Sequence, residues 1–288
     1  MRSNYTLTHM LQVKPLTKKN YHFAVELANT MNWNMAVEDF EFMATLEHGG
    51  CFLLVDGAER LGIATCISYG KVGWFGNLVV KEDSRRRGGG SALVKHALNY
   101  LRGKGVETVG LYSYPHLQGF YRRLGFKFDQ DFSVLVAVNF VAPKLEPLLR
   151  VGKDQFPAVA RFDGSFFGAD RAKLLKSIIL QEGNAAYYVS DGKEVIGYVA
   201  ATIYESMAWV GPLICQPNRP DVAASLVKSI LSQVGGRSVY AVTSKSDLAL
   251  QGILAKFGFK EEFYVSRMFL GQSVAKNCIY LAESLERG

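Results

Sequence analysis

A short stretch occurs twice in this chain, and this repeat restricts the fold more than any other feature of the sequence. LQGFYRRLGFK begins at Leu117 and LQGILAKFGFK begins at Leu250, an offset of 133 residues. Solenoid and propeller repeats have periods of roughly 20–50 residues, whereas an offset of this size leaves each copy enough chain for its own hydrophobic core. The sequence therefore predicts a duplicated domain.

The order of the expected elements is also repeated. In the first half, apolar spacing and turn residues predict helices and an antiparallel meander of three strands, then a helix, a strand, a short helix and a last strand. The expected ranges are 17–31, 37–47, 51–55, 60–70, 72–80, 90–105, 108–114, 117–126 and 132–140. The second half gives helix 169–183, strands 185–191, 194–204 and 206–216, helix 221–235, strand 238–244 and helix 248–259.

A segment with three prolines and no sustained period separates the two halves near residues 141–157. We expect an α/β (α+β) protein with a first domain over 1–142, a linker over 143–155 and a second domain over 156–288. Each domain is expected to hold a mixed, mostly antiparallel twisted sheet flanked by helices.

Composition narrows the class of protein. Hydrophobic residues make up 49% and charged residues 20% of the chain, which is typical of a globular protein. No apolar run approaches the roughly 20 residues of a membrane span, and the first residues lack the apolar core of a secretory signal. The four cysteines lack metal-binding spacing, so we expect buried thiols at Cys51 and Cys66, no metal and a cytoplasmic protein.

The net charge of +7 is spread along the chain without an aromatic–basic repeat, so no nucleic-acid partner is expected. A basic protein is equally suited to an anionic cofactor.

The densest positive charge of the chain adjoins three consecutive glycines, in RRRGGGSAL over residues 85–93. Glycines without Cβ atoms let the backbone approach a ligand closely. The start of the following helix adds free N–H groups and a partial positive charge. Arginines add further attraction for an anion. This stretch therefore predicts a phosphate-binding loop.

Two common phosphate-binding motifs do not fit. A P-loop requires Lys-Ser or Lys-Thr after its glycines, and none follows here. A dinucleotide fingerprint requires Gly or Ala at its third position and a βαβ unit. Leu93 stands at that position, after an antiparallel meander.

A third pattern, R/Q-x-x-G-x-G/A, is matched by Arg85, Gly88 and Gly90. Together with GFYRRLGF further along, which is similar to xxYxxLGF, it resembles the GNAT N-acetyltransferase superfamily. The meander, the glycine loop, the helix, the strand and this second motif occur over residues 1–140 in the order that family shows.

The resemblance implies that acetyl-CoA is the acyl donor. The pyrophosphate would be bound by backbone N–H groups and arginines of the loop, and the pantetheine arm would pair with strand residues 78–80, where the N–H of Val80 would polarise the thioester carbonyl. The implied cofactor-binding residues are Leu78, Val79, Val80, Arg85, Arg86, Arg87, Gly88, Gly89, Gly90 and Ser91.

By the same resemblance, Tyr121 is the general acid that protonates the leaving thiolate. The general base stays open, because the fourth and fifth strands contain no carboxylate and His116 lies in a loop. Tyr114 stands where many members of the family carry a cofactor-orienting asparagine.

The second half is similar to the C-terminal GNAT-like domain of tandem acetyltransferases, but CQPNRPDVAASL replaces the glycine loop and Leu254 replaces Tyr121. We therefore expect this half to lack cofactor and to cover the acceptor. Asp170 and Arg171 are either acceptor contacts or a helix cap and a solvent-exposed cation.

The sequence thus predicts an N-acetyltransferase acting on an amine of a small molecule, a protein or a peptide by direct attack in a ternary complex. The alternative is a non-catalytic acyl-CoA-binding or regulatory protein. Neither the acceptor nor the oligomeric state follows from the sequence.

Overall fold

The structure is a computed structural model that describes residues 11–144, 148–274 and 276–288. The chain forms two compact units. The first unit comprises Met1–Ser68 and Gly73–Val106, and the second comprises Tyr69–Val72 and Glu107–Gly288. Residues 1–10, where no signal segment was expected, and residues 145–147 of the expected linker lie outside the described residues.

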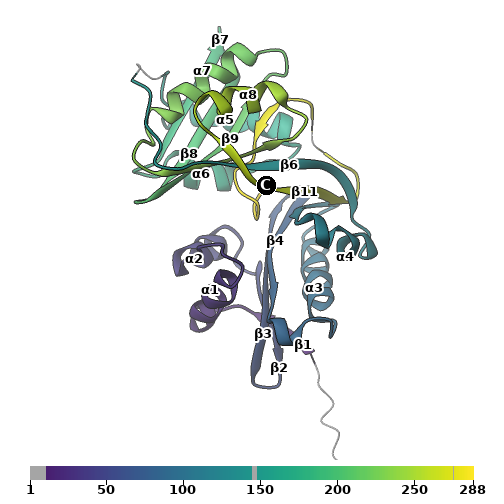
Figure 1. Cartoon of the computed structure of the whole chain (residues 1–288). Coiled ribbons are helices and arrows are strands. Elements are labelled where there is room, and N and C mark those ends of the chain that lie inside the picture. The colour runs from purple at the N-terminus through teal and green to yellow at the C-terminus, as the bar shows by residue number, and fades with distance from the viewer. Residues whose placement is uncertain (1–10, 145–147, 275) are drawn as a thin grey trace, which may run out of the picture. The chain divides into compact units, whose positions relative to one another are not determined.

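The sheet of the first unit is a meander in the order β1-β2-β3-β4. Its strands are β1 (Leu11–Pro15), β2 (Cys51–Asp56), β3 (Glu59–Tyr69) and β4 (Val72–Val80). Helices α1 (Tyr21–Asn29) and α2 (Val37–Leu46) cover one face, and α3 (Gly89–Gly103) covers the other (Figure 1). Because both faces are covered, β2 is buried along almost its whole length.

The sheet of the second unit has the strand order β5-β11-β6-β10-β12-β9-β8-β7. These strands are β5 (Thr108–Ser113), β6 (Lys127–Ala137), β7 (Ala185–Asp191), β8 (Glu194–Ile203), β9 (Met207–Cys215), β10 (Ser238–Ser244), β11 (Lys260–Leu270) and β12 (Ile279–Leu281). The helices are α4 (Gln118–Arg123), α5 (Phe156–Phe167), α6 (Ala172–Ile179), α7 (Pro220–Leu231) and α8 (Leu248–Lys256).

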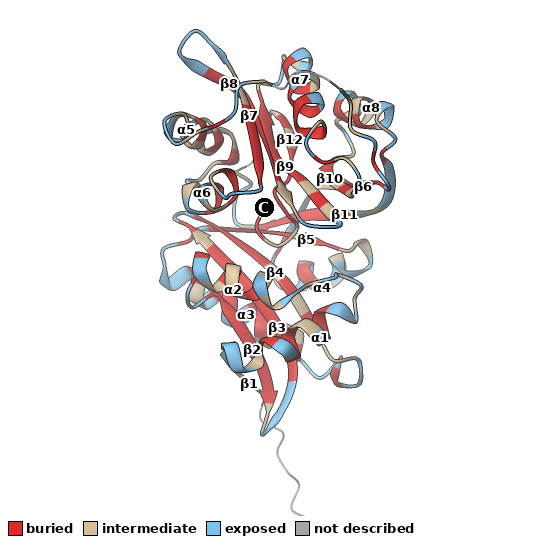
Figure 2. Cartoon of the chain, turned by 90° about the vertical axis from the view of Figure 1, so that its left-hand side faces the viewer, coloured by how far each residue is buried: buried red, intermediate tan, exposed pale blue. Residues whose placement is uncertain are grey.

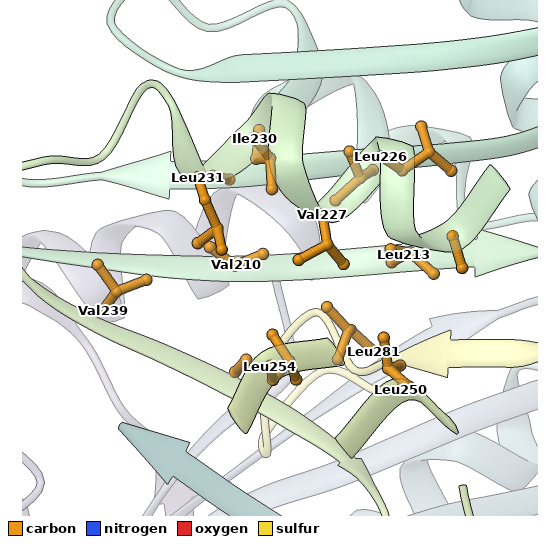
Figure 3. Packing of buried hydrophobic residues seen from close by; sticks show 14 of the residues in the cluster. Val210, Leu213, Leu226, Val227, Ile230, Leu231, Val239, Leu250, Leu254 and Leu281 are labelled. Carbon is orange, nitrogen blue, oxygen red and sulfur yellow. The ribbon is translucent and has the colours of Figure 1, made fainter. Parts of the chain in front are cut away.

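Helices α5 and α6 lie on one side of β7–β9, and α7 lies on the other (Figure 2). The core beneath α7 and α8 consists of aliphatic side chains such as Leu213, Leu226 and Leu254 (Figure 3). Leu254, the counterpart of Tyr121 in the repeat, is fully buried there. Its position in the second copy therefore serves packing.

The last long strands of the two repeats, β6 and β11, are exchanged: each pairs with the strand that comes just before the last long strand of the other repeat. Strand β11 runs antiparallel to β5, with Arg267 opposite Tyr112. Strand β6 runs antiparallel to β10, with Val134 opposite Val242. The two exchanged strands also pair with each other. The compact units therefore do not coincide with the sequence repeats, and the boundaries 1–142, 143–155 and 156–288 stay a prediction about the repeats.

The α/β class and the mostly antiparallel sheet are confirmed. The sequence did not reveal β1, β11, β12 or the helix α5. Helix α5 begins next to Pro157, in the segment interpreted as linker, because proline is compatible with the first turn of a helix.

Candidate functional site

The loop between β4 and α3 is closed by Arg85. Its Nε donates a hydrogen bond to the carbonyl oxygen of Val80 at 3.0 Å, and its Nη2 lies 3.9 Å from the Sδ of Met31. A short 3-10 turn, Glu82–Ser84, connects the end of β4 at Val80 to Arg85. Arg85 therefore bends back onto the end of its own strand and holds the loop in place.

The three glycines of the loop have different roles. Gly88 has a φ of 86° and is the residue before α3, and a Cβ built on it would meet no atom within 4 Å. A Cβ on Gly89 would lie 2.5 Å from the Cδ2 of Leu54. Gly88 thus provides a left-handed turn beside open space, whereas Gly89 allows close packing of α3 against β2.

The start of α3 has the features of an anion-binding site. Ala92 is the first residue whose N–H bonds back, to the carbonyl of Gly88 at 3.0 Å, so the N–H groups of Gly89, Gly90 and Ser91 have no partner inside the helix. The first turn contains no acidic residue, and no side chain caps it. The helix dipole is therefore not compensated by the chain itself.

Arg86 and Arg87 are exposed beside this helix start. Arg86 has a φ of 64°, so two left-handed residues, Arg86 and Gly88, shape the loop. Within the described part of the chain, neither arginine forms a salt bridge or a side-chain hydrogen bond. Both guanidinium groups are available to an anion at the start of α3.

Strand β4 contains a feature that the sequence analysis missed. Asn77 has a φ of 51° in the middle of the strand, and its Nδ2 donates to the Oγ1 of Thr65 at 3.1 Å. Asparagine adopts this left-handed conformation more readily than most residues. Leu78 and Val80, directly after this irregularity, are half-buried, and Val79 is buried. An asparagine inside a run of β-branched and aromatic residues is the signal that could have located it.

Tyr121 lies in the second unit, on α4, and is 5% exposed. Its ring contacts Phe120 and Phe126 edge-on, with centroids 5.0 and 5.8 Å away. Burial raises the pKa of its phenol well above the usual range. The hydroxyl therefore keeps its proton at neutral pH, as a general acid must, and its role stays a prediction.

Strands β4 and β5 carry no carboxylate, in agreement with the sequence. His116 is exposed in the turn Pro115–Leu117 and stacks on Tyr114 at 5.8 Å. Buried Glu47, at the end of α2, accepts hydrogen bonds from the hydroxyl of Tyr100 at 2.6 Å and from the N–H of Ser68 at 3.0 Å. Glu47 also pairs with Lys104 at 2.6 Å, so this carboxylate anchors the fold.

The corresponding helix of the second half, α7, starts differently. Pro220 is its first residue, and Arg219 precedes it with a φ of −123°. The Arg219 guanidinium pairs with Asp221 in the first turn at 2.9 Å. This hydrogen bond lowers the pKa of Asp221. The chain's own carboxylate therefore occupies the positive end of α7, which disfavours a phosphate there.

Asp170 and Arg171 have separate roles. The Oδ1 of Asp170 accepts from the N–H of Ala172 at 2.8 Å, as expected for a residue at a helix start. Arg171 is fully buried, which excludes the expected solvent-exposed cation. It forms two hydrogen bonds with the buried carboxylate of Asp163, at 2.8 and 2.9 Å, and Asp163 also accepts from the hydroxyl of Tyr198.

Other kinds of site find no support in the described residues. They contain no cluster of three or more His, Cys, Asp or Glu side chains suited to a metal. No helix among them is long and apolar enough to cross a membrane. Cys51 and Cys66 are buried as expected, and burial raises the pKa of Cys51 to about 12.

Two family models match the chain, one in each half. The model described as Acetyltransferase (GNAT) family matches residues 20–126, and the model described as Acetyltransferase (GNAT) domain matches residues 159–280. A curated relative, serotonin N-acetyltransferase 2 of rice, is 42% identical over 55 residues. That match spans 19% of this chain and 28% of the relative.

Solved structures share the fold over nearly the whole chain. A Pyrococcus horikoshii chain assigned as an acetyltransferase has a TM-score of 0.80 at 21% identity and covers 100% of this chain and 99% of its own. A GCN5-related N-acetyltransferase from Sphaerobacter thermophilus has a TM-score of 0.68 at 14% identity, and the match covers 93% of this chain and 96% of that one. A tandem GNAT protein from the clavulanic acid biosynthesis pathway has a TM-score of 0.61 at 13% identity, and the match covers 93% of this chain and 99% of that one.

Proposed function

Because this chain belongs to the GNAT N-acetyltransferase family, with one GNAT domain in each half, we propose that it transfers the acetyl group of acetyl-CoA to an amine, using a single cofactor site in the first half. The family is one of acetyl-CoA-dependent acyltransferases. The observation that carries the single site is the contrast between two helix starts. At the start of α3, after Gly88, no acidic side chain compensates the helix dipole, whereas at the start of α7 the carboxylate of Asp221 does so.

Acetyl-CoA fits the residues at the start of α3. Its pyrophosphate would accept hydrogen bonds from the N–H groups of Gly89, Gly90 and Ser91, and Arg86 and Arg87 would add charge. The open space at Gly88 leaves room for the phosphates. Residues Leu78–Val80 would pair with the pantetheine arm, as an added strand pairs with a sheet edge.

In the transfer, the neutral amine nitrogen attacks the thioester carbonyl carbon in a ternary complex. The C–N bond forms, the C–S bond breaks, and the amine proton leaves to a base. Tyr121 gives its phenolic proton to the departing sulfur, and its raised pKa keeps that proton in place until then. We assign no side chain as the base.

A non-catalytic acyl-CoA-binding protein is the second candidate, because β4 and β5 lack a carboxylate. A thiol-release assay with acetyl-CoA and a panel of small amines and peptides distinguishes the two. Acceptor-dependent thiol release supports transfer. Tight acetyl-CoA binding without thiol release for any amine supports the binding protein. The rice relative contributes no choice of acceptor, because the match covers only 55 residues.

A further inference from the structure

Strands β9 and β10 of the second unit pair with each other over only part of their length. They run parallel up to Val210, which lies opposite Ala241. Beyond this point β12 lies between them in the sheet. Strand β12 runs antiparallel to β9, and Leu281 lies opposite both Leu213 of β9 and Thr243 of β10. We call the position between β9 and β10 beyond Val210 and Ala241 the strand groove, and β12 fills it.

The β10 side of the strand groove bonds to the backbone of the inserted segment. The N–H of Ala282 donates to the carbonyl oxygen of Val242 at 2.9 Å. The Oγ1 of Thr243 donates to the carbonyl oxygen of Tyr280 at 3.0 Å. Backbone hydrogen bonds of this kind hold an extended chain, whereas pockets for its side chains select the sequence.

The side chains of the inserted segment supply that selection. Ile279 and Leu281 belong to the aliphatic core beneath α7 and α8, and Figure 3 shows Leu281 among the side chains there. Tyr280 packs against the cluster on the opposite face, as the alternation of a strand requires. Leu281 and Ala282 are completely buried. The strand groove therefore suits an extended peptide that is apolar on both faces.

Gly211 lets the inserted segment come close to β9. A Cβ built on this glycine would overlap the carbonyl oxygen of Ala282. The φ of Gly211 is not positive, so this position requires glycine for space and not for its backbone conformation. Close approach of another backbone is a common reason for a glycine inside a strand. Strand β9 is thus shaped to receive the segment.

The strand groove has a counterpart in the first half. The run AWVGPLIC over residues 208–215 aligns with GWFGNLVV over residues 73–80, with Trp, Gly and Leu identical at three positions. Leu213–Cys215 therefore correspond to Leu78–Val80, the residues proposed above to pair with the pantetheine arm of acetyl-CoA. The first and third of the latter residues keep part of their surface accessible, whereas all three counterparts in β9 are completely buried.

We propose that the strand groove of the second half is a peptide-binding site in the position that corresponds to the pantetheine arm, and that the chain's own segment Ile279–Ala282 is its ligand. This segment closes the second half to acyl-CoA independently of Asp221 at the start of α7. The correspondence to the cofactor arm rests on the function proposed above, whereas the binding of a peptide in the groove does not.

Binding of a peptide in trans tests the groove. The probe is a fluorescein-labelled peptide with the sequence of residues 276–288 and the change Cys278→Ser. In the wild type the tethered segment competes at an effective concentration on the order of millimolar. Ala282→Pro removes the N–H that bonds to Val242 and should release the segment without changing β9 or β10. By fluorescence anisotropy, this full-chain variant should bind the peptide at least about ten-fold more tightly than the wild type, the scale of one buried hydrogen bond.

Gly211→Ala is the matched control. Its Cβ should also expel the segment, but it should exclude the added peptide as well, because it changes the groove itself. Hydrogen exchange of the N–H groups of Tyr280–Ala282 should therefore speed up in both variants, while only Ala282→Pro binds the peptide. Leu281→Asp releases the segment by a second route, a charge in the aliphatic core. Leu174→Ala, which removes buried atoms from α6, controls for lost stability and should not bind the peptide.

Three results would overturn the proposal. The first is equal peptide affinity for the wild type and Ala282→Pro. The second is binding to Gly211→Ala that is as tight as binding to Ala282→Pro. The third is hydrogen exchange that shows release of the segment in Ala282→Pro and Leu281→Asp while neither variant binds the peptide.

Acetylpantetheine separates the groove from its correspondence to the cofactor arm. This compound has the amide-containing arm without the phosphates, so at millimolar concentration it should displace the peptide from Ala282→Pro. If the peptide binds but acetylpantetheine does not displace it, the correspondence is wrong. If acetylpantetheine displaces the peptide but no amine supports thiol release from acetyl-CoA, the proposed transfer fails and the groove stands.

Discussion

The Nε of Arg85 lies 3.0 Å from the carbonyl oxygen of Val80 and donates to it, so this arginine is occupied within its own loop. Its two neighbours, Arg86 and Arg87, are exposed and have no such bond in the described residues. The three consecutive arginines are therefore expected to act on acetyl-CoA in two ways.

Arg86→Ala and Arg87→Ala should lower the affinity for acetyl-CoA. This loss should shrink as salt is raised, because exposed charges are screened over about 8–10 Å at ordinary ionic strength. Arg85→Ala should lower the affinity about three- to ten-fold at any salt concentration, because the substitution removes a hydrogen bond that orders the loop. Affinities at low and high salt check this. An identical salt dependence for all three variants would contradict the distinction.

Substitutions of Gly88 and Gly89 should have different effects on stability and on acetyl-CoA binding. Gly89→Ala should lower the free energy of unfolding by about 1–3 kcal/mol, because its Cβ would overlap Leu54. Gly88→Ala should cost about 1–2 kcal/mol at most, from its left-handed backbone, and should chiefly weaken acetyl-CoA. Denaturant unfolding and titration separate these effects. The control is Gly103→Ala, where a Cβ meets no atom within 4 Å and φ is not positive.

Tyr121→Phe should lower kcat about 10²–10⁴-fold at saturating acetyl-CoA, while the affinity for acetyl-CoA changes little. Phenylalanine keeps the ring contacts with Phe120 and Phe126, so the fold should persist. The assay is thiol release with a working acceptor. A wild-type kcat in this variant would show that Tyr121 only packs.

Burial of Tyr121 also makes stability depend on alkaline pH. Its pKa is raised in the folded state, whereas a tyrosine in the unfolded chain ionises near pH 10. Its contribution to stability is therefore complete below about pH 10 and is lost as the pH rises above that value. Between pH 8 and 11 the free energy of unfolding should therefore fall less steeply with pH for Tyr121→Phe than for the wild type. Equal slopes for the two proteins would contradict the burial of this phenol.

Asp163→Asn should destabilise the second unit by about 3–5 kcal/mol, because it leaves the fully buried Arg171 without its carboxylate. Chemical denaturation measures the loss. The control is Glu107→Gln, which removes an exposed carboxylate paired with Lys71 and should change stability by less than about 1 kcal/mol. A small effect of Asp163→Asn would show that water reaches Arg171.

The sequence predicted the parts of this protein that depend on local patterns. The glycine loop, the start of α3 and the meander follow from residue types at short spacing, and the structure places them within one unit. The exchange of β6 and β11 could not be predicted, because pairing between Arg267 and Tyr112 joins residues far apart in the sequence. Burial of Arg171 was missed for the same reason, since Tyr198 and Asp163 meet only in the folded chain.

Residues of the same type in the loop between β4 and α3 have different roles, which the sequence alone does not reveal. Three arginines and three glycines suggested one phosphate-binding stretch. The conformation shows that Arg85 bonds to Val80 and that Gly89 is packed against Leu54. Such roles depend on what lies opposite each residue, which the sequence does not contain.

The central claim is that acetyl-CoA is held at the start of α3 and nowhere else in the chain. Calorimetric titration of acetyl-CoA into the full chain tests it most directly, with Gly88→Val as the disabling variant and Arg219→Ala, before α7, as the matched control. We predict one site per chain, lost in Gly88→Val and unchanged in Arg219→Ala. Two comparable sites per chain, or a single site that survives Gly88→Val and is lost in Arg219→Ala, would contradict the account.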